Sequence, residues 1–315
     1  PGMKTPTPFS GLPTSADALR IGFIGAGRLG QALAWSLDRA GLKVTAVSSK
    51  VESDAQALAQ PISGCECLQA QQVADSCDLV FVTTPDSVIG ETCDRLDWHA
   101  GQAVVHCSGV TEVAALQHAL AQGACIGGFH PMQTFGDPLA AARSLPGCTI
   151  TVEAEDDQLM ALLLALVERL ACAANRLPAG MRARYHAAAG YTSQFINALF
   201  DQAIRLWQTW GATEQEALRA LLPLAQGTLS SIQSAGVARG MPGPVSRGDL
   251  SSIDKHLGAI RPMGPQMFEF YRTLCTATVP IARHAGGIDE DRALQFLALI
   301  QGQEQDCPVG ERRAG

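Results

Sequence analysis

Short apolar segments alternate with helical patterns along the first half of the chain. The apolar segments span residues 19–24, 42–47, 79–83, 103–106, 124–129 and 148–152. They are largely continuous rather than alternating, which is typical of strands in a sheet that is covered on both faces. After the first segment, apolar residues recur at helical spacing over 28–40, and Gly41 would end that helix. The pattern predicts an α/β domain built on a doubly wound parallel Rossmann sheet.

A glycine-rich turn lies between the first predicted strand and the first predicted helix. Its residues are Gly25, Ala26, Gly27, Arg28, Leu29 and Gly30. Gly25 permits a tight turn, Gly27 lets the backbone approach a pyrophosphate, and Gly30 allows close packing of helix on strand. The helix N-terminus then offers free N–H groups to the phosphates. The turn predicts a dinucleotide site, and the alternative is a structural glycine turn in another kind of α/β protein.

The end of the second predicted strand bears on which dinucleotide binds. An NAD-binding chain usually carries a carboxylate there for the ribose hydroxyls. This chain has Ser48, Ser49 and Lys50 instead, whose hydroxyls and positive charge could hold a 2′-phosphate. Glu52 lies two residues further on and weakens the inference. We therefore expect NADP(H) rather than NAD(H).

The later strand ends should line the same crevice, because ligands in such sheets bind beyond the carboxyl ends of the strands. Three groups follow these strands: Thr83, Thr84 and Pro85; His106, Ser108 and Gly109; and His130, Gln133 and Thr134. We expect the first group, with Ser108 and Gly109, to bind the cofactor. His106 and Gln133 are candidates for binding substrate, and His130 is a candidate catalytic residue. A purely structural role for each histidine is an equal alternative.

The strand signal stops after about residue 178, and only helical patterns follow. They cover 182–210, 213–235, 249–260, 263–285 and 289–301. Thr213 is a suitable N-cap, and Glu216 would complete a capping box. We therefore expect a Rossmann domain over 18–177 and an all-α domain over 178–303, with tails at 1–17 and 304–315.

The first long helical pattern carries a row of polar and small residues. His186, Gly190, Ser193 and Asn197 are spaced by four, three and four, so they would share one face of a single helix. His186 is a candidate general acid, because the pKa of histidine can be tuned near neutrality. Ser193 is a second catalytic candidate, and Asn197 is a candidate for binding substrate. The alternative is a helix-packing face with one buried histidine.

A glycine- and proline-rich loop over 237–248 leads into the next helix. Arg247 could clamp a substrate carboxylate or phosphate with its guanidinium fork. An ion pair between Arg247 and Asp249 is an equal alternative. We favour Asp249 as the N-cap of the helix that follows.

Composition narrows the class of protein. The net charge is −7, which leaves no electrostatic footprint for nucleic acid. No segment is long and apolar enough to cross a bilayer, and no secretory signal is recognisable. The ten cysteines are dispersed without paired metal-ligand spacing, so we expect reduced thiols, a cytoplasmic protein and no metal site.

Several segments together resemble a known family. They are His106-Cys107-Ser108-Gly109, His130-Pro131-Met132-Gln133-Thr134-Phe135, Tyr185-His186-Ala187-Ala188-Ala189, Gly243-Pro244-Val245-Ser246-Arg247-Gly248-Asp249 and Lys255-His256-Leu257. The N-terminal half resembles factor-420-dependent NADP oxidoreductases and pyrroline-carboxylate reductases. The whole pattern resembles the bacterial family that joins this Rossmann half to a helical C-terminal domain of unknown function. The resemblance implies a 6-phosphogluconate-dehydrogenase-like second domain and a homodimer formed through it.

The chain also departs from its relatives. It has Ser193-Gln194 where members of the family commonly have Ser-Asn, which puts any role of that asparagine in doubt here. The long helical pattern lacks the lysine that β-hydroxyacid dehydrogenases use, and Arg182 and Arg184 are its early cations. The chemistry of those dehydrogenases is therefore not expected.

These observations favour an NADP-dependent oxidoreductase that reduces a small carbonyl or imine. The site would lie between the domains, with His186 or His130 donating a proton and Arg247 binding an anionic substrate group. One alternative is an NADP(H)-binding sensor or accessory protein without catalysis. Another is a reductase with a deazaflavin co-substrate, for which the sequence shows no pocket.

Overall fold

The computed structural model describes residues 11–302, which divide into two compact units between Phe195 and Ile196. We describe each unit by itself. The expected boundary at residue 177 followed the end of the strand signal. The first unit continues beyond it because the next helix packs on the sheet through Arg182 and Tyr185.

The first unit is built on an eight-stranded sheet with the order β3-β2-β1-β4-β5-β6-β7-β8. The strands are β1 (Arg20–Ile24), β2 (Lys43–Ser48), β3 (Glu66–Cys67), β4 (Leu79–Val82), β5 (Ala103–His106), β6 (Cys125–Pro131), β7 (Thr149–Ala154) and β8 (Ala173–Arg176). The strand order reverses at β1, as in a doubly wound fold, so the predicted architecture is confirmed. Ligands in such sheets bind at this reversal.

The pairing of β6 with β7 corrects the expectation of a wholly parallel sheet, because these two strands are antiparallel. All the other pairs are parallel. Two short strands, β3 and β8, were not predicted. Neither carries an apolar run, since β3 is Glu-Cys and β8 is Ala-Ala-Asn-Arg.

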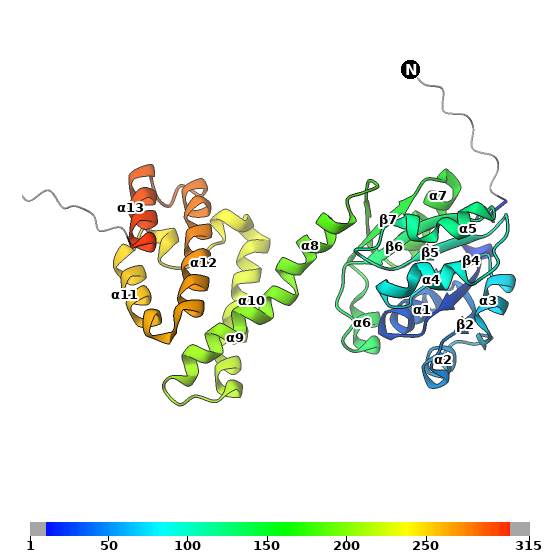
Figure 1. The fold of residues 1–315 in the computed structure, drawn as a ribbon, viewed down its shortest axis with the longest axis horizontal. Helices are drawn as coiled ribbons and strands as arrows, with labels where there is room; N and C mark the ends of the chain where they lie inside the picture. The colour runs from blue at the N-terminus through cyan, green and yellow to red at the C-terminus, as the bar shows by residue number, and fades with distance from the viewer. Residues whose placement is uncertain (1–10, 303–315) are drawn as a thin grey trace, which may run out of the picture. The chain divides into compact units, whose positions relative to one another are not determined.

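Helices cover both faces of this sheet (Figure 1). They are α1 (Arg28–Arg39), α2 (Glu52–Ala59), α3 (Ala70–Ser76), α4 (Ile89–Asp94), α5 (Gln117–Ala121), α6 (Pro138–Ser144), α7 (Asp157–Arg169) and α8 (Arg182–Thr192), with 3-10 turns at Ala16–Ala18, Asp86–Val88 and Val113–Leu116. Helix α1 ends as predicted, since Gly41 has a φ of +81° just after the last turn.

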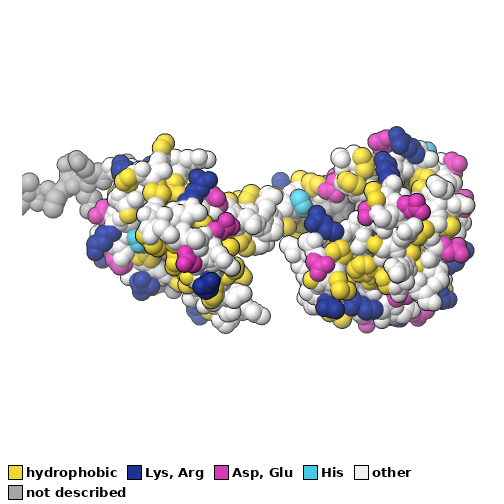
Figure 2. Space-filling model, turned by 90° about the horizontal axis from the view of Figure 1, so that it is seen from below, with side chains coloured by type: hydrophobic (Ala, Val, Ile, Leu, Met, Phe, Trp, Pro, Cys, Tyr) yellow, Lys and Arg dark blue, Asp and Glu magenta, His cyan; other side chains and the backbone are white. Residues whose placement is uncertain are grey.

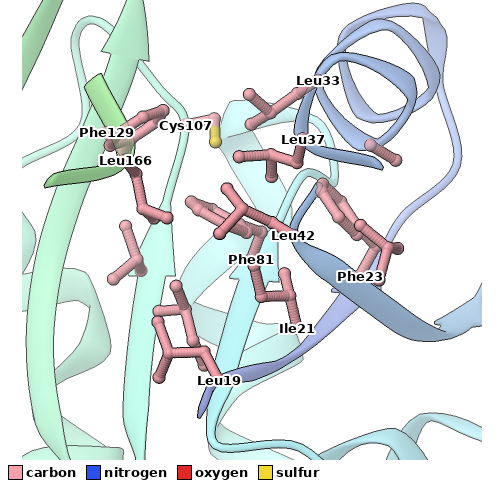
Figure 3. Close-up of a cluster of buried hydrophobic side chains, with 14 of the residues drawn as sticks. Leu19, Ile21, Phe23, Leu33, Leu37, Leu42, Phe81, Cys107, Phe129 and Leu166 are labelled. Carbon is pink, nitrogen blue, oxygen red and sulfur yellow. The ribbon is translucent and has the colours of Figure 1, made fainter. Parts of the chain in front are cut away.

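Alternate residues of the strands feed two separate cores. Phe23, Phe81 and Phe129 point to one face, where their rings contact in sequence at centroid distances of 5.3 and 5.4 Å (Figure 3). Helices α1 and α7 contribute leucines to this core, among them Leu33 and Leu166. The opposite core contains Val80, Val82 and Val104 with residues of α3 to α5. Burial on both faces explains why the strands read as continuous apolar runs.

The N-terminal segment corrects part of the predicted tail over residues 1–17. Leu12 is only 3% exposed and Ala16 belongs to a 3-10 turn capped by the Ser15 hydroxyl, so residues 12–16 pack on the domain. The rest of that tail, residues 1–10, and the tail predicted at 304–315 lie outside the described residues.

The second unit is helical throughout its described part. Its helices are α9 (Gln194–Gln208), α10 (Glu214–Arg239), α11 (Leu250–Ile260), α12 (Pro265–His284) and α13 (Glu290–Gln301), with 3-10 turns at Val245–Arg247 and Arg261–Met263. The predicted N-cap at Thr213 and its capping box with Glu216 are confirmed. An all-α region after the sheet is thus confirmed as well.

The single helix predicted over 182–210 is wrong. Helix α8 ends at Thr192, and Ser193 takes non-helical angles of φ −127° and ψ −89° before α9 begins. His186 and Asn197 therefore do not share one helix face. A further kink occurs in α10 at Gly236, whose φ is +79°.

Buried side chains are unevenly distributed in the second unit. Phe296, Val279 and Ile253 centre a core shared by α11, α12 and α13, which Figure 1 shows side by side. By contrast, α9 has no buried residue and α10 has one, Ala217. No described helix combines the length and apolar composition needed to cross a bilayer.

Candidate functional site

The glycine turn between β1 and α1 is held by close backbone contacts. Gly25 has a φ of +107°, and a Cβ there would lie 2.7 Å from the backbone of Thr83 and Thr84. A Cβ on Gly30 would lie 2.8 Å from the Gly25 carbonyl oxygen and 2.9 Å from Thr83 Oγ1. Gly27 differs, because a Cβ there would meet no protein atom within 4 Å. The fold therefore requires Gly25 and Gly30, whereas Gly27 keeps space open above the turn.

That space belongs to a cavity of about 1150 Å³ at the carboxyl ends of the strands around β1. The predicted cofactor residues 25–29, 48–50 and 83–85 all line it, together with Ser108. Two predicted cofactor residues do not. Gly30 packs behind the turn, and Gly109 lies under two histidines described below. A large cleft over a helix N-terminus at a switch in strand order suits a dinucleotide.

The cavity has two chemically different ends. Ser48, Ser49 and Lys50 line the end beyond β2, where Lys50 is exposed. Glu52, which weighed against NADP(H) in the sequence, does not line the cavity and accepts a hydrogen bond from Gln56. Asp54 does line it, and the sequence reasoning missed it. The other end is formed after β4, β5 and β6.

Thr134 lines the β4 and β5 end as predicted, and Asp86, the residue after Pro85, lines it too. Cys107, Phe135 and Gly136 also line this end and were not predicted. Arg28 reaches across to this side, where its Nη1 donates to the Gly136 carbonyl at 3.3 Å. In the face of the first unit that Figure 2 shows, lysine, arginine and carboxylate side chains are interspersed, without a basic patch.

His106, at the end of β5, is fully buried and does not line the cavity. Its Nδ1 accepts a hydrogen bond from the backbone N–H of Ser108 at 3.2 Å. Burial, reinforced by the positive charge of Arg182, lowers the pKa of His106 to about 3. His106 therefore shapes the loop after β5 as a neutral, buried group.

A row of residues runs across β5, β6 and β7 beside His106. The strand register pairs His106 with Gly128 and Gly128 with Glu153. Arg182, the fully buried first residue of α8, lies over this row. Its Nε donates to Glu153 Oε2 and its Nη1 to the Ser108 carbonyl, both at 2.7 Å. A Cβ on Gly128 would overlap Arg182 Nη2, so the arginine requires a glycine beneath it.

A second row lies two residues further along the same face. The register pairs His130 with Thr151 and Thr151 with Asn175. Asn175 Nδ2 donates to Thr151 Oγ1 at 3.0 Å. Tyr185, three residues after Arg182 on α8, places its hydroxyl 2.7 Å from His130 Nδ1 and also hydrogen bonds with Thr151. Helix α8 thus contacts one row through Arg182 and the next through Tyr185.

The environment of the second row keeps its members uncharged at neutral pH. Burial lowers the pKa of His130 to about 4, and the charges of His186 and Arg182 add to the effect. Burial raises the pKa of Tyr185, while the hydrogen bond from Thr151 and the charge of Arg182 oppose that rise. At pH 7 the row therefore consists of a neutral imidazole and a neutral phenol.

His186 lies beside His130, with ring centroids 6.4 Å apart. Gly109 is beneath both: a Cβ there would lie 2.7 Å from His186 Cδ2 and 2.9 Å from His130 Nε2. Ser108, the residue before Gly109, lines the cavity. The two histidines that were predicted to be catalytic are thus brought together one residue from the cavity wall.

The other predicted site residues lie apart from this pair. Gln133 donates to Ser144 and Cys148 and accepts from the Thr134 N–H. Ser193, at the end of α8, donates its hydroxyl hydrogen to the Ala189 carbonyl at 2.7 Å. Both contacts are within the protein, so substrate contact or catalysis by either remains a prediction.

Asn197 and Arg247 belong to the second unit. Asn197 lines a separate groove between α9 and α10, and Arg247 is exposed in the 3-10 turn before α11. Asp249 caps α11 by accepting from the Ser252 N–H at 3.0 Å, so the predicted cap is confirmed. A role of Asn197 or Arg247 in binding substrate remains a prediction.

Sequence reasoning missed the residues that support His130. The candidates did not include Tyr185, Thr151, Asn175 or Arg182, and they did not include Glu153, whose carboxylate accepts a hydrogen bond from Arg182.

 Glu153 lies on β7, opposite Gly128. A usable signal was present in the spacing of Arg182, Tyr185 and His186, which places all three on one face of a helix. The strand partners gave no such signal, because their pairing depends on the register of β6, β7 and β8.

Comparisons with known proteins agree with this architecture. A Rossmann-like domain family matches residues 3–131, and a domain of unknown function, DUF2520, matches residues 148–278. The second match begins at the start of β7, so it includes the last two strands of the sheet as well as α7 to α11 and most of α12. The expected pairing of a Rossmann half with a helical domain of unknown function is confirmed. No curated protein matches the chain.

Solved structures of similar fold include NADP-dependent reductases. A Bacteroides fragilis protein provisionally described as an NADP oxidoreductase is 25% identical, with a TM-score of 0.66 over 82% of this chain and 97% of that one. A reductive aminase from Aspergillus terreus, in complex with NADPH4, cyclohexanone and allyl amine, is 17% identical, with a TM-score of 0.59 over 88% and 99%. A pyrroline carboxylate reductase from Plasmodium falciparum with NADP bound is 10% identical, with a TM-score of 0.55 over 90% and 99%.

Proposed function

We propose that this chain, which joins a Rossmann-like domain to a domain of unknown function, is an NADP(H)-dependent oxidoreductase that reduces a small carbonyl or imine compound. The observation that carries the proposal is the cavity over the glycine turn, with Ser48, Ser49 and Lys50 at one end and Ser108 at the other. The similarity to NADP-dependent reductases supports the same class of reaction.

The orientation of the cofactor follows from the order of the strands. The pyrophosphate would lie over Gly27 at the N-terminus of α1, and the adenosine would extend toward Lys50 beyond β2. The nicotinamide would then extend past Thr83 toward Ser108. That orientation brings the nicotinamide near Gly109 and therefore near His130 and His186.

The choice of NADPH over NADH is testable by calorimetric titration of the full chain. We expect NADPH to bind at least about tenfold more tightly, or about 1.4 kcal/mol, because Lys50 and the two serines favour a 2′-phosphate. Lys50→Glu should abolish that preference by replacing attraction with repulsion.

Lys43→Glu is the matched control, since Lys43 is an exposed lysine at the start of β2, whereas Lys50 follows the end of that strand. It should leave both affinities unchanged. Equal affinity of the unmodified chain for NADPH and NADH would contradict the choice of cofactor, and binding of neither would contradict the proposed function.

We also propose that two copies of the chain associate through the helical unit. Helix α9 has no buried residue although its apolar residues follow helical spacing, and Leu224 and Leu229 of α10 are 66% and 58% exposed. An isolated helix of this kind is stable only when its apolar face is covered. A second copy would cover it with the same surface, as in a twofold dimer.

The association is testable by light scattering coupled to size exclusion. We expect a mass of twice the 33.1 kDa of one chain. A variant with Leu224→Glu and Leu229→Glu should shift the mass toward one chain, because it places two charges in the apolar contact. Leu120→Glu, an exposed leucine of the first unit, should not change the mass. A single-chain mass for the unmodified protein would contradict the proposal.

A further inference from the structure

The hydrogen bonds of the second row have a direction. The Thr151 oxygen accepts from Asn175 Nδ2, so its own hydrogen is free to be donated elsewhere. Thr151 is fully buried, and a buried hydroxyl needs an acceptor. Within the described contacts the Tyr185 oxygen is that acceptor. Tyr185 then donates its hydrogen to His130 Nδ1.

This direction determines which nitrogen of His130 carries a hydrogen. An imidazole that accepts at Nδ1 and is neutral holds its hydrogen at Nε2. His130 Nε2 lies next to the position that a side chain of residue 109 would occupy, and that residue is glycine. Among the described residues, His130 Nε2 has no hydrogen-bond partner and is not one of the buried unpaired atoms. This neutral N–H donor is therefore available to a ligand, beside the loop in which Ser108 lines the cavity.

We infer that the reducible group of the substrate is a carbonyl, and that His130 Nε2 donates the hydrogen to its oxygen. The inference rests on the proposed NADPH-dependent reduction. NADPH, when bound over the glycine turn, would supply a hydride to the carbonyl carbon, and the π electron pair would then remain on the oxygen. The oxygen takes the proton of His130 Nε2, while His130 Nδ1 takes the proton of Tyr185. The products are an alcohol, NADP⁺ and a tyrosinate, which solvent reprotonates.

The charges around the row favour an oxygen that becomes negative. Arg182 supplies a buried positive charge, and Thr151 donates to the Tyr185 oxygen when it loses its hydrogen. Glu153 is paired with Arg182, and Glu112 accepts from the Gly180 N–H. An iminium, the form of an imine that accepts hydride, is positive and has no lone pair for His130 Nε2. The row therefore suits a carbonyl and opposes an iminium.

The first test needs no substrate. Nitrogen-15 NMR of labelled histidines in the full chain, with His130 assigned through His130→Gln, reports which ring nitrogen bears hydrogen. We expect neutral His130 with hydrogen at Nε2 from about pH 5 to pH 8, because the pKa of His130 is about 4 with His106, Tyr185, His186 and Arg182 facing it. Hydrogen at Nδ1, or a charged ring at pH 7, would overturn the inference.

The second test compares substrates. NADPH oxidation is followed with a panel of small aldehydes and ketones and with 1-pyrroline as a cyclic imine. We expect oxidation with carbonyl compounds and none with 1-pyrroline. Oxidation with 1-pyrroline alone would overturn this inference and leave the proposed function standing. Binding of NADPH without oxidation by either kind of compound would overturn both.

Tyr185 is a positioning residue in this scheme, and Tyr185→Phe isolates its role. We expect kcat to fall on the order of a hundredfold, with KM and NADPH affinity unchanged. The reason is that the His130 imidazole then loses the donor that keeps its hydrogen at Nε2 and the group that would return a proton to Nδ1. In the unmodified chain, kcat should stay level between about pH 5 and pH 9, because the pKa of His130 is about 4 and that of Tyr185 is raised from 10.

The second unit offers a matched control. Tyr271 hydrogen bonds to His256 Nδ1 at 2.8 Å, the same kind of pair as Tyr185 with His130. Tyr271→Phe should leave kcat and its pH profile unchanged. A Tyr185→Phe variant that behaves like Tyr271→Phe would show that the phenol serves only to pack α8.

Discussion

Replacing Arg182 with methionine should lower the free energy of unfolding of the first unit by about 3–5 kcal/mol. Methionine fills most of the same space, but it leaves Glu153 without its partner in a place where that side chain is only 12% exposed. The Ser108 carbonyl also loses the hydrogen bond from Nη1. A buried charge without a partner is costly, because nothing replaces the water that it gave up.

Urea unfolding of the full chain measures this cost, with near-ultraviolet circular dichroism as the signal. Adding Glu153→Gln to Arg182→Met should recover part of the loss, because a neutral amide is cheaper to bury than an unpaired carboxylate. Arg205→Met is the control. Arg205 pairs with Asp201 on the exposed surface of α9, so its loss should cost less than about 1 kcal/mol. Equal effects of Arg182→Met and Arg205→Met would contradict the proposed importance of burial.

Much of the sheet could be predicted because local sequence dictates it. The strands β1, β2, β4 and β5 are apolar runs that end in turns, and Gly41 and Thr213 mark helix ends by local chemistry. The direction of β7 could not be predicted, since an apolar run reads the same in both directions. The break between helices at Ser193 could not be predicted either, because the helical spacing of apolar residues continues through it and neither proline nor glycine occupies that position.

The candidate site was predictable in part for the same reason. Strand ends lie at one edge of a parallel sheet, so Lys50, Thr83 and Ser108 could be placed together from the sequence. The rows that include His130 could not. They depend on antiparallel register between β6 and β7 and on α8 contacting the sheet, which are contacts between residues far apart in the chain. Because these contacts are not visible in the sequence, Arg182 was identified only as a cation near the start of a predicted helix.

Gly27→Ala should weaken the binding of NADPH by about a hundredfold, or about 2.8 kcal/mol, and leave the thermal midpoint within about 3 °C. The protein itself has room for a methyl group at Gly27, whose φ of −68° suits alanine. The space that the methyl group would fill is the space over the N-terminus of α1 where the pyrophosphate is proposed to lie. Affinity and stability should therefore respond separately, as measured by calorimetric titration and thermal unfolding.

The other glycines of the chain make this separation decisive. Gly25→Ala should lower the thermal midpoint, because a φ of +107° and the backbone of Thr83 leave no room for a side chain. Gly227→Ala, inside α10 with no atom within 4 Å of its Cβ position, should change neither quantity adversely. If Gly27→Ala binds NADPH as tightly as Gly227→Ala does, the cofactor does not approach the turn, and the glycine motif of this chain is structural. If only Gly27→Ala loses affinity at unchanged stability, the cavity over that turn is the dinucleotide site.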